Sequence, residues 1–67
     1  MVVVGDKMKI YVLRKKAGIT QKELAKKLNV SQQAVVKWEK GSSFPSADKL
    51  PELARALNCN IEELYEG

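Results

Sequence analysis

The chain has 67 residues, enough for one small domain, and its 45% hydrophobic content is ordinary for a folded protein and argues against disorder. One cysteine and no histidine exclude a disulfide within the chain and a metal site built from cysteine and histidine. The sequence has no glycine-rich phosphate loop and no nucleophile with a plausible base, so we expect no enzyme, cofactor or metal.

The net charge of +4 is unevenly distributed. Residues 1–40 hold ten Lys or Arg and three Asp or Glu, a net of +7, whereas residues 41–67 hold two and five, a net of −3. This asymmetry suits a protein with one side facing DNA and one side turned away. Lysine-rich helix faces that serve only solubility are the alternative, and the charge distribution taken alone favours this alternative.

Residues 1–5 are predicted to form a flexible tail and residues 6–67 a single domain, although the three valines near the start could instead add a strand to a partner chain. The first apolar run is too short for a signal peptide, and no segment approaches transmembrane length. We therefore expect a cytoplasmic, nucleoid-associated protein with no membrane partner.

A first helix is predicted over about Lys7 to Lys16, with Asp6 as its N-cap and Gly18 as its C-cap. Its inward stripe is Met8 or Ile10, then Val12 or Leu13.

A second helix is predicted to begin at Gln21. Thr20 and Glu23 form a T-x-x-E capping box, in which each side chain satisfies the backbone amide of the other residue. Asn29 follows as a turn residue that tolerates a left-handed backbone. The apolar stripe at helical spacing is Leu24, Ala25 and Leu28.

A third helix is predicted from Gln32 to about Lys40, with Ser31 as its cap and with Val35 and Trp38 facing inward. Its outward face shows two amides, one small apolar group and two cations, whereas a merely solvated helix more often mixes Glu and Lys. These outward residues are Gln32, Gln33, Val36, Lys37 and Lys40.

After a loop over residues 41–45, a fourth helix is predicted to start at Ser46 or Asp48 and to run to about Asn58. Asp48 is favoured, because it leaves Pro51 in the first turn, where proline is tolerated. The inward residues are Leu50, Leu53, Ala54 and Leu57.

Asn60 and Glu63 form a second capping box and predict a short fifth helix that buries Ile61 and Leu64. Cys59, between the last two helices, is interpreted as a small apolar packing residue, with a reactive thiol as the alternative. The predicted fold is all-α, a compact five-helix bundle.

The ordered set of residues from Thr20 to Gly41 resembles the Cro/repressor-type (XRE-like) helix-turn-helix family of bacterial and phage regulators. Inside the motif the resemblance rests on Gln21, Ala25, Asn29, Val35, Trp38, Glu39 and Gly41. Outside it, the matching residues are Ile10, Leu13, Arg14, Gly18, Ile19, Pro45, Leu50, Leu53, Ala54, Leu57, Ile61 and Leu64. The resemblance covers about residues 6–65 and implies a lambda-repressor-like DNA-binding domain, with helices 2 and 3 forming the helix-turn-helix. Asn29, usually Gly in the family, and Val36, often polar, are departures.

Base reading is expected near the N-terminus of the third helix, where side chains reach the major groove. A glutamine amide can pair with adenine in a bidentate manner, worth ~1–3 kcal/mol of discrimination. Gln32 and Gln33 are therefore the first candidates, and some lambdoid phage repressors carry the same pair; a solvated helix start is the alternative. Lys37 could bind guanine or a phosphate, and Val36 could contact a thymine methyl group or be partly buried.

Phosphate contacts are expected where helix N-termini and hydroxyl or ammonium groups lie beside the groove. In the resembling family, the residue that matches Gln21 contacts phosphate and can brace a glutamine of the recognition helix, here Gln32. The further phosphate candidates are Ser31, Lys40, Ser42 and Ser43, although the last two could be only a flexible loop.

The resemblance also implies an inward ion pair between Arg14 and Glu39, which we interpret as structural instead of as a DNA contact. Trp38 is likewise expected in the core and not as a platform for base stacking.

The predicted function is a sequence-specific transcriptional regulator of double-stranded DNA, a repressor that binds a palindromic operator as a homodimer. The two recognition helices would lie about 34 Å apart. Candidate dimerisation residues are Ile61, Leu64 and Tyr65. The alternative is an antitoxin or transcription adaptor that binds a toxin or another regulator through its acidic end and the loop of Phe44.

Overall fold

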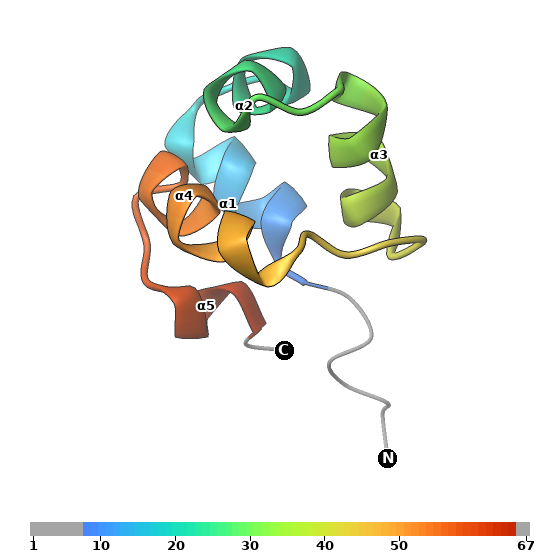
Figure 1. The fold of residues 1–67 in the computed structure, drawn as a ribbon. Coiled ribbons are helices and arrows are strands. Elements are labelled where there is room, and N and C mark those ends of the chain that lie inside the picture. The colour runs from blue at the N-terminus through green and yellow to red at the C-terminus, as the bar shows by residue number, and fades with distance from the viewer. Residues whose placement is uncertain (1–7, 66–67) are drawn as a thin grey trace.

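The structure, a computed structural model, describes residues 8–65. These residues form five α-helices and one 3₁₀ helix: α1 (Ile10–Ala17), α2 (Gln21–Leu28), α3 (Gln32–Lys40), η1 (Ala47–Lys49), α4 (Leu50–Ala56) and α5 (Ile61–Tyr65). The described part contains no strand, and the predicted all-α, five-helix architecture is confirmed. Figure 1 shows α1 in the middle of the bundle and α3 at one side of it. The predicted tail, residues 1–5, and the predicted cap Asp6 lie outside the described residues.

Four helices are followed, within two residues of their last residue, by a residue with a left-handed backbone. The residues are Gly18, Asn29, Gly41 and Asn58, with φ of 76°, 59°, 82° and 59°. In each case the amide of the following residue donates to a carbonyl five residues back, as Val30 does to Ala25 at 3.0 Å. This Schellman geometry satisfies carbonyls that the helix leaves free. The turns predicted at Gly18 and Asn29 are therefore confirmed.

Three helix starts are capped as the sequence predicts. The Thr20 hydroxyl accepts from the Glu23 amide at 3.0 Å, and the Glu23 carboxylate accepts from the Thr20 amide at 2.8 Å. Asn60 and Glu63 make the same reciprocal pair, both at 2.9 Å. The Ser31 hydroxyl accepts from the Ala34 amide at 3.1 Å and so begins α3.

The predicted start of the first helix is wrong by three residues, because α1 begins at Ile10 and not at Lys7. The chain before Ile10 is instead attached to α5, since the Lys9 amide donates to the Leu64 carbonyl at 2.9 Å. Met8 is buried there and contributes to the core beside Ile10.

The predicted cap of the fourth helix is also wrong. Ser46, with an extended backbone, stands at the N-cap position of η1, and Asp48 lies inside that 3₁₀ turn. The Ser46 hydroxyl donates to the Asp48 carboxylate, and this hydrogen bond lowers the pKa of Asp48. Pro51 does fall in the first turn of α4, where its missing amide costs no helical hydrogen bond. Because Asn58 is left-handed, α4 ends at Ala56, before the predicted end.

The core is a single cluster between the helices. Its members are Met8, Ile10, Leu24, Ala25, Leu28, Val35, Trp38, Leu53, Ala54, Leu57 and Leu64. Ala25 is buried on α2, where a small side chain lets α3 pack closely. The predicted burial of Ile61 is wrong, because Ile61 is the first residue of the five-residue α5 and is 40% exposed, whereas Leu64, one turn further along, reaches the core. On α1, Leu13 is half-buried and Val12 is exposed.

Candidate nucleic-acid interface

The recognition surface that we describe is the outward face of α3 with the loop that follows it. Val35 and Trp38 anchor the opposite side of the helix, because both side chains are buried in the core. This anchoring determines which residues face away from the bundle. The outward residues are Gln32, Gln33, Lys37 and Lys40, all exposed, and Val36, which is half-buried.

Gln32 and Gln33 are the first two residues of α3 and follow the cap residue Ser31. Ser31 is exposed, and its hydroxyl oxygen already accepts the Ala34 amide, so its hydroxyl hydrogen remains available to donate. The helix start thus presents two amide side chains and one hydroxyl donor to solvent. The positive end of the helix dipole lies at the same place and favours an anion.

A hollow runs along this face, from the second residue of α3 to the start of the following loop. It has a volume of about 680 Å³ and is lined by Gln33, Val36, Lys37, Lys40 and Ser42. Four of these five side chains are polar or cationic, and Val36 is the apolar member. The structure therefore combines two ammonium groups, a hydroxyl, an amide and one small apolar surface in a single concavity.

The loop after α3 is held at its start by backbone hydrogen bonds. The amides of Ser42 and Ser43 both donate to the Lys37 carbonyl, at 2.9 and 3.4 Å. Ser42 is exposed, whereas Ser43 is half-buried. Because both amides are occupied, only the hydroxyl groups of these serines can donate to a ligand.

Gln21 lies at the first position of α2 and is half-buried. Its Nε2 donates to Glu39 Oε1 at 2.9 Å, across to the end of α3. The expected contact with Gln32 is not formed, since no hydrogen bond links these two glutamines in the described part of the chain. The amide group of Gln21 keeps a second N–H, which remains free to donate.

Arg14 and Glu39 form the expected ion pair, with Arg14 Nε donating to Glu39 Oε2 at 2.6 Å. Arg14 Nη1 also donates to the Ile19 carbonyl at 2.9 Å, and the guanidinium lies 5.4 Å from the centre of the Tyr11 ring. With the Gln21 bond included, Glu39 joins α1, the start of α2 and the end of α3. This network determines how α3 is oriented on the bundle.

Lys49 and Tyr11 are positioning residues that the sequence interpretation missed. The Lys49 ammonium donates to the Leu28 carbonyl at 3.0 Å, which attaches η1 to the end of α2 beside the turn. No local pattern signals this contact, because the two residues are 21 positions apart. Tyr11 could have been found only from its position three residues before Arg14 on a helix.

Comparison with known proteins places this geometry in a family. The model of the helix-turn-helix family matches residues 10–64. The chain belongs to this helix-turn-helix family. It is 42% identical over 57 residues to an uncharacterized HTH-type transcriptional regulator of Archaeoglobus fulgidus, covering 85% of this chain and 81% of that protein.

Two further comparisons connect the chain with a phage repressor. It is 36% identical over 59 residues to repressor protein C2 of Salmonella phage P22, covering 88% of this chain and 27% of the repressor. The crystal structure of the P22 c2 repressor with a synthetic operator superposes with a TM-score of 0.83 at 32% identity, covering 98% of each chain.

An activator, BcrR of Enterococcus faecalis, is 36% identical over 59 residues, covering 88% of this chain and 29% of the activator.

These relatives are helix-turn-helix transcriptional regulators, and one of them is a phage repressor. The chain spans less than a third of the length of the P22 repressor and of BcrR, but most of the length of the archaeal relative. None of the described helices is long and apolar enough to cross a bilayer. The described residues also contain no cluster of three or more His, Cys, Asp or Glu that could bind a metal ion.

The candidate dimerisation residues of this helix-turn-helix protein are not equally available. Ile61 is 40% exposed and Tyr65 is 47% exposed, so both can contact another chain. Leu64 is fully buried, which contradicts the expectation that it takes part in self-association. Leu64 packs into the core of its own chain, and its carbonyl accepts the Lys9 amide at 2.9 Å.

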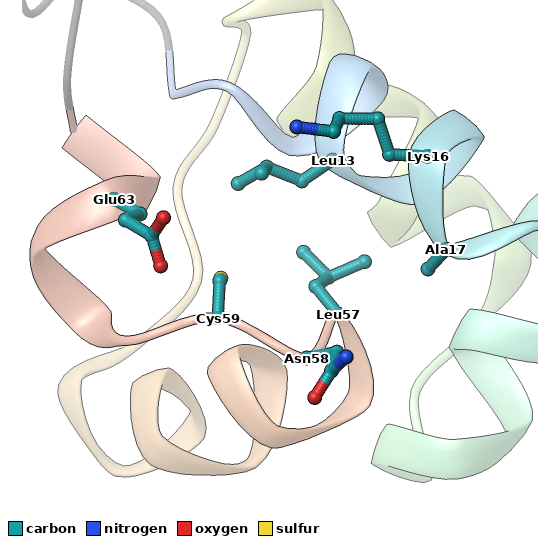
Figure 2. A pocket seen from close by; sticks show the side chains of 7 residues that line it. All are labelled: Leu13, Lys16, Ala17, Leu57, Asn58, Cys59 and Glu63. Atoms are coloured by element: carbon teal, nitrogen blue, oxygen red, sulfur yellow. The ribbon is translucent and has the colours of Figure 1, made fainter.

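Cys59 lies in a second hollow, of about 180 Å³, between α1 and the turn that joins α4 to α5. Figure 2 shows Leu13, Leu57 and Cys59 together in this hollow, with Glu63 beside them. Burial, and secondarily the Glu63 carboxylate, raise the pKa of the Cys59 thiol. A thiol that stays protonated is a poor nucleophile, which supports the packing role.

Proposed function

We propose that this chain is a sequence-specific DNA-binding repressor that inserts α3 into the major groove of a palindromic operator. The observation that carries the proposal is the separation of the two faces of α3. Val35 and Trp38 are buried, while Gln32, Gln33 and Lys37 project from the opposite side near the start and middle of the helix. A helix presented in this way fits the major groove and brings its first residues to the base edges.

In this proposal the two glutamines read bases. Each amide can donate to N7 and accept from N6 of an adenine, which discriminates by ~1–3 kcal/mol against another base. Lys37 lies one turn further along α3 and is exposed, so its ammonium group can reach guanine O6 and N7 or a phosphate.

Phosphate contacts would come from the edges of the same surface. Ser31 has a free hydroxyl hydrogen at the start of α3, and Lys40 is exposed near its end. Ser42 and Ser43 would contribute hydroxyl groups, and Gln21 the second N–H of its amide. These contacts would hold the register of α3 without reading sequence.

A homodimer follows from the small size of one recognition surface. A single α3 reaches only a few base pairs, whereas two copies about 34 Å apart would read a palindrome on one side of the duplex. Ile61 and Tyr65 provide exposed apolar surface on α5 for such an isologous contact. Repression is favoured over activation because the fold of the P22 repressor, in a complex with a synthetic operator, matches almost the whole chain.

The experiment that tests the proposal is selection from a random duplex library at ~150 mM salt, because non-specific binding weakens steeply as salt rises. The wild-type chain and the double variant Gln32→Ala, Gln33→Ala are compared. The double variant should keep its thermal stability, because both residues are exposed and alanine favours helix. We expect a palindrome to be enriched by the wild type and lost or relaxed by the variant.

The opposite outcomes are equally clear. Salt-sensitive binding with no enriched sequence would refute the proposal and direct attention to a protein partner of the exposed Phe44 loop. Sedimentation of the complex with the selected operator should show two chains per duplex, and a single chain per palindrome would refute the homodimer.

A further inference from the structure

We infer that the two copies of the proposed homodimer pair by packing α5 of each chain against α1 of the other, with an apolar hollow beside α1 as the docking site. The inference rests on the proposed function and deepens it, because it names the surfaces through which the copies meet. The hollow has a volume of about 390 Å³ and is lined by Met8, Lys9, Tyr11, Val12 and Glu39. Met8, Tyr11 and Val12 make its walls mainly apolar.

Exposed apolar side chains gather at the end of the molecule where this hollow lies. Tyr11 and Val12, in the first turn of α1, are 51% and 48% exposed, and α5 exposes Ile61 and Tyr65 to a similar degree. The Lys9 amide donates at 2.9 Å to a carbonyl near the end of α5, so the start of α1 and α5 lie at the same end of the bundle (Figure 1). A large exposed apolar surface marks a contact with another molecule.

The charges of the two helices determine which of them pair. α1 carries the exposed Lys15 and Lys16, follows directly on Lys9, and contains no acidic residue. α5 carries Glu62 and Glu63 and contains no basic residue. Packing α5 on a second α5, or α1 on a second α1, would bring like charges together, which disfavours a contact. Packing α5 on the partner's α1 brings opposite charges together, so charge complementarity selects this arrangement.

The position of the two helices allows this contact to be isologous. Because the start of α1 lies against the end of α5, a two-fold axis through this end of the molecule sets each α5 opposite the α1 of the other copy. Ile61 and Tyr65 are four residues apart and share one face of α5. In this arrangement Tyr65 enters the hollow of the other copy, Ile61 packs at its edge, and Glu62 faces the partner's Lys9. The recognition helix α3 lies at another side of the bundle and stays uncovered (Figure 1).

Cross-linking between two differently tagged chains tests which helices meet. One chain carries Val12→Cys and the other Tyr65→Cys, and both carry Cys59→Ala so that no other thiol reacts. The chains are mixed with the selected operator and a short bis-maleimide. We expect a product that joins positions 12 and 65, and none that joins two copies of position 65. Lys22→Cys, at an exposed position of α2, is the matched control and should give no product with Tyr65→Cys.

A charge exchange tests the same contact with Cys59 in place. Lys9→Glu and Glu62→Lys should each weaken the association of two chains on the operator about fivefold, as expected for two exposed ion pairs, and sedimentation of the complex measures this loss. The chain with both substitutions should recover the wild-type association, because opposite charges again face each other. Glu52→Lys, the same change at an exposed position of α4, should leave the association unchanged.

The outcomes separate this inference from the function on which it rests. A product that joins two copies of position 65, or two chains per operator with no product between positions 12 and 65, would overturn the contact between α5 and α1 alone. A double charge variant that associates no better than the single variants would do the same. A single chain per operator would refute the proposed homodimer together with this inference, whereas base reading by the two glutamines would be judged separately by the selection experiment.

Discussion

Replacing Arg14 by methionine should destabilise this small domain severely. Arg14 and Glu39 have side chains that are only 10% and 8% exposed, and Nε lies 2.6 Å from Oε2. Arg14→Met removes the charge but keeps an unbranched side chain of similar length. Glu39 would then retain the Gln21 amide as its remaining hydrogen-bond partner. A carboxylate shielded from water in this way is left without a counter-charge.

The expected loss is about 3 kcal/mol, at the lower end of the ~3–5 kcal/mol found when one partner of a buried pair is removed, because the pair keeps some contact with water. A chain of this length has a total stability of roughly 3–10 kcal/mol. The variant should therefore lose a large part of its free energy of unfolding. Glu39→Met should cost less, because Arg14 would keep the Ile19 carbonyl and the Tyr11 ring.

Urea unfolding, followed by the fluorescence of Trp38, measures this loss directly. Trp38 is the single tryptophan and is buried, so its emission reports unfolding of the core. With a slope of ~1 kcal/mol per molar urea, the midpoint should fall by about 3 M. A double-mutant cycle with Arg14→Met and Glu39→Met gives the coupling energy between the two side chains.

The reasoning predicts that the double variant is more stable than Arg14→Met alone, because no unpaired charge remains. If Arg14→Met lost less than about 1 kcal/mol, or if the two losses simply added, the pair would behave as a surface salt bridge. Either result would contradict the role that we give to Glu39 in joining three helices.

Three other predictions concern the caps, the phosphate contacts and the cysteine. Thr20→Ala and Ser31→Ala should each lower the free energy of unfolding by ~1 kcal/mol, because each removes an N-cap hydrogen bond. The melting temperature should fall accordingly, and an unchanged melting temperature would count against the caps. Lys40→Ala should weaken binding to all duplexes by a similar factor and reduce the salt slope by about one per chain, as salt titrations would show. Folding raises the pKa of the Cys59 thiol above its value of about 9.0 in the unfolded chain, so the protonated thiol contributes to the free energy of unfolding below pH 9.0. That contribution is lost as the pH rises through the pKa of the thiol in the folded chain. Alkylation of Cys59 at pH 8.5 should accordingly be slower in the folded than in the unfolded chain, and Glu63→Gln, which can still cap α5, should speed it.

Much of this architecture follows from neighbours in the sequence. The capping boxes of Thr20 with Glu23 and of Asn60 with Glu63 join residues three positions apart, so the sequence predicts them directly. The turn at Asn29 is equally local. The outward residues of α3 follow from helical periodicity once Val35 and Trp38 are taken as the inward side.

Contacts between distant parts of the chain were decided only by the tertiary structure. α1 begins late because the Lys9 amide meets the carbonyl of Leu64, a residue 55 positions away. Gln21 turns to Glu39 and not to Gln32, and the Lys49 ammonium reaches the end of α2. By itself, the sequence determined that the chain forms five helices, the caps at Thr20, Ser31 and Asn60, and the polar face of α3, because these depend on hydrogen bonds and spacing within a few residues. The tertiary structure alone decided that Leu64 is buried, that Ile61 is exposed and that Val36 lies outside the core, because these depend on how separate helices pack.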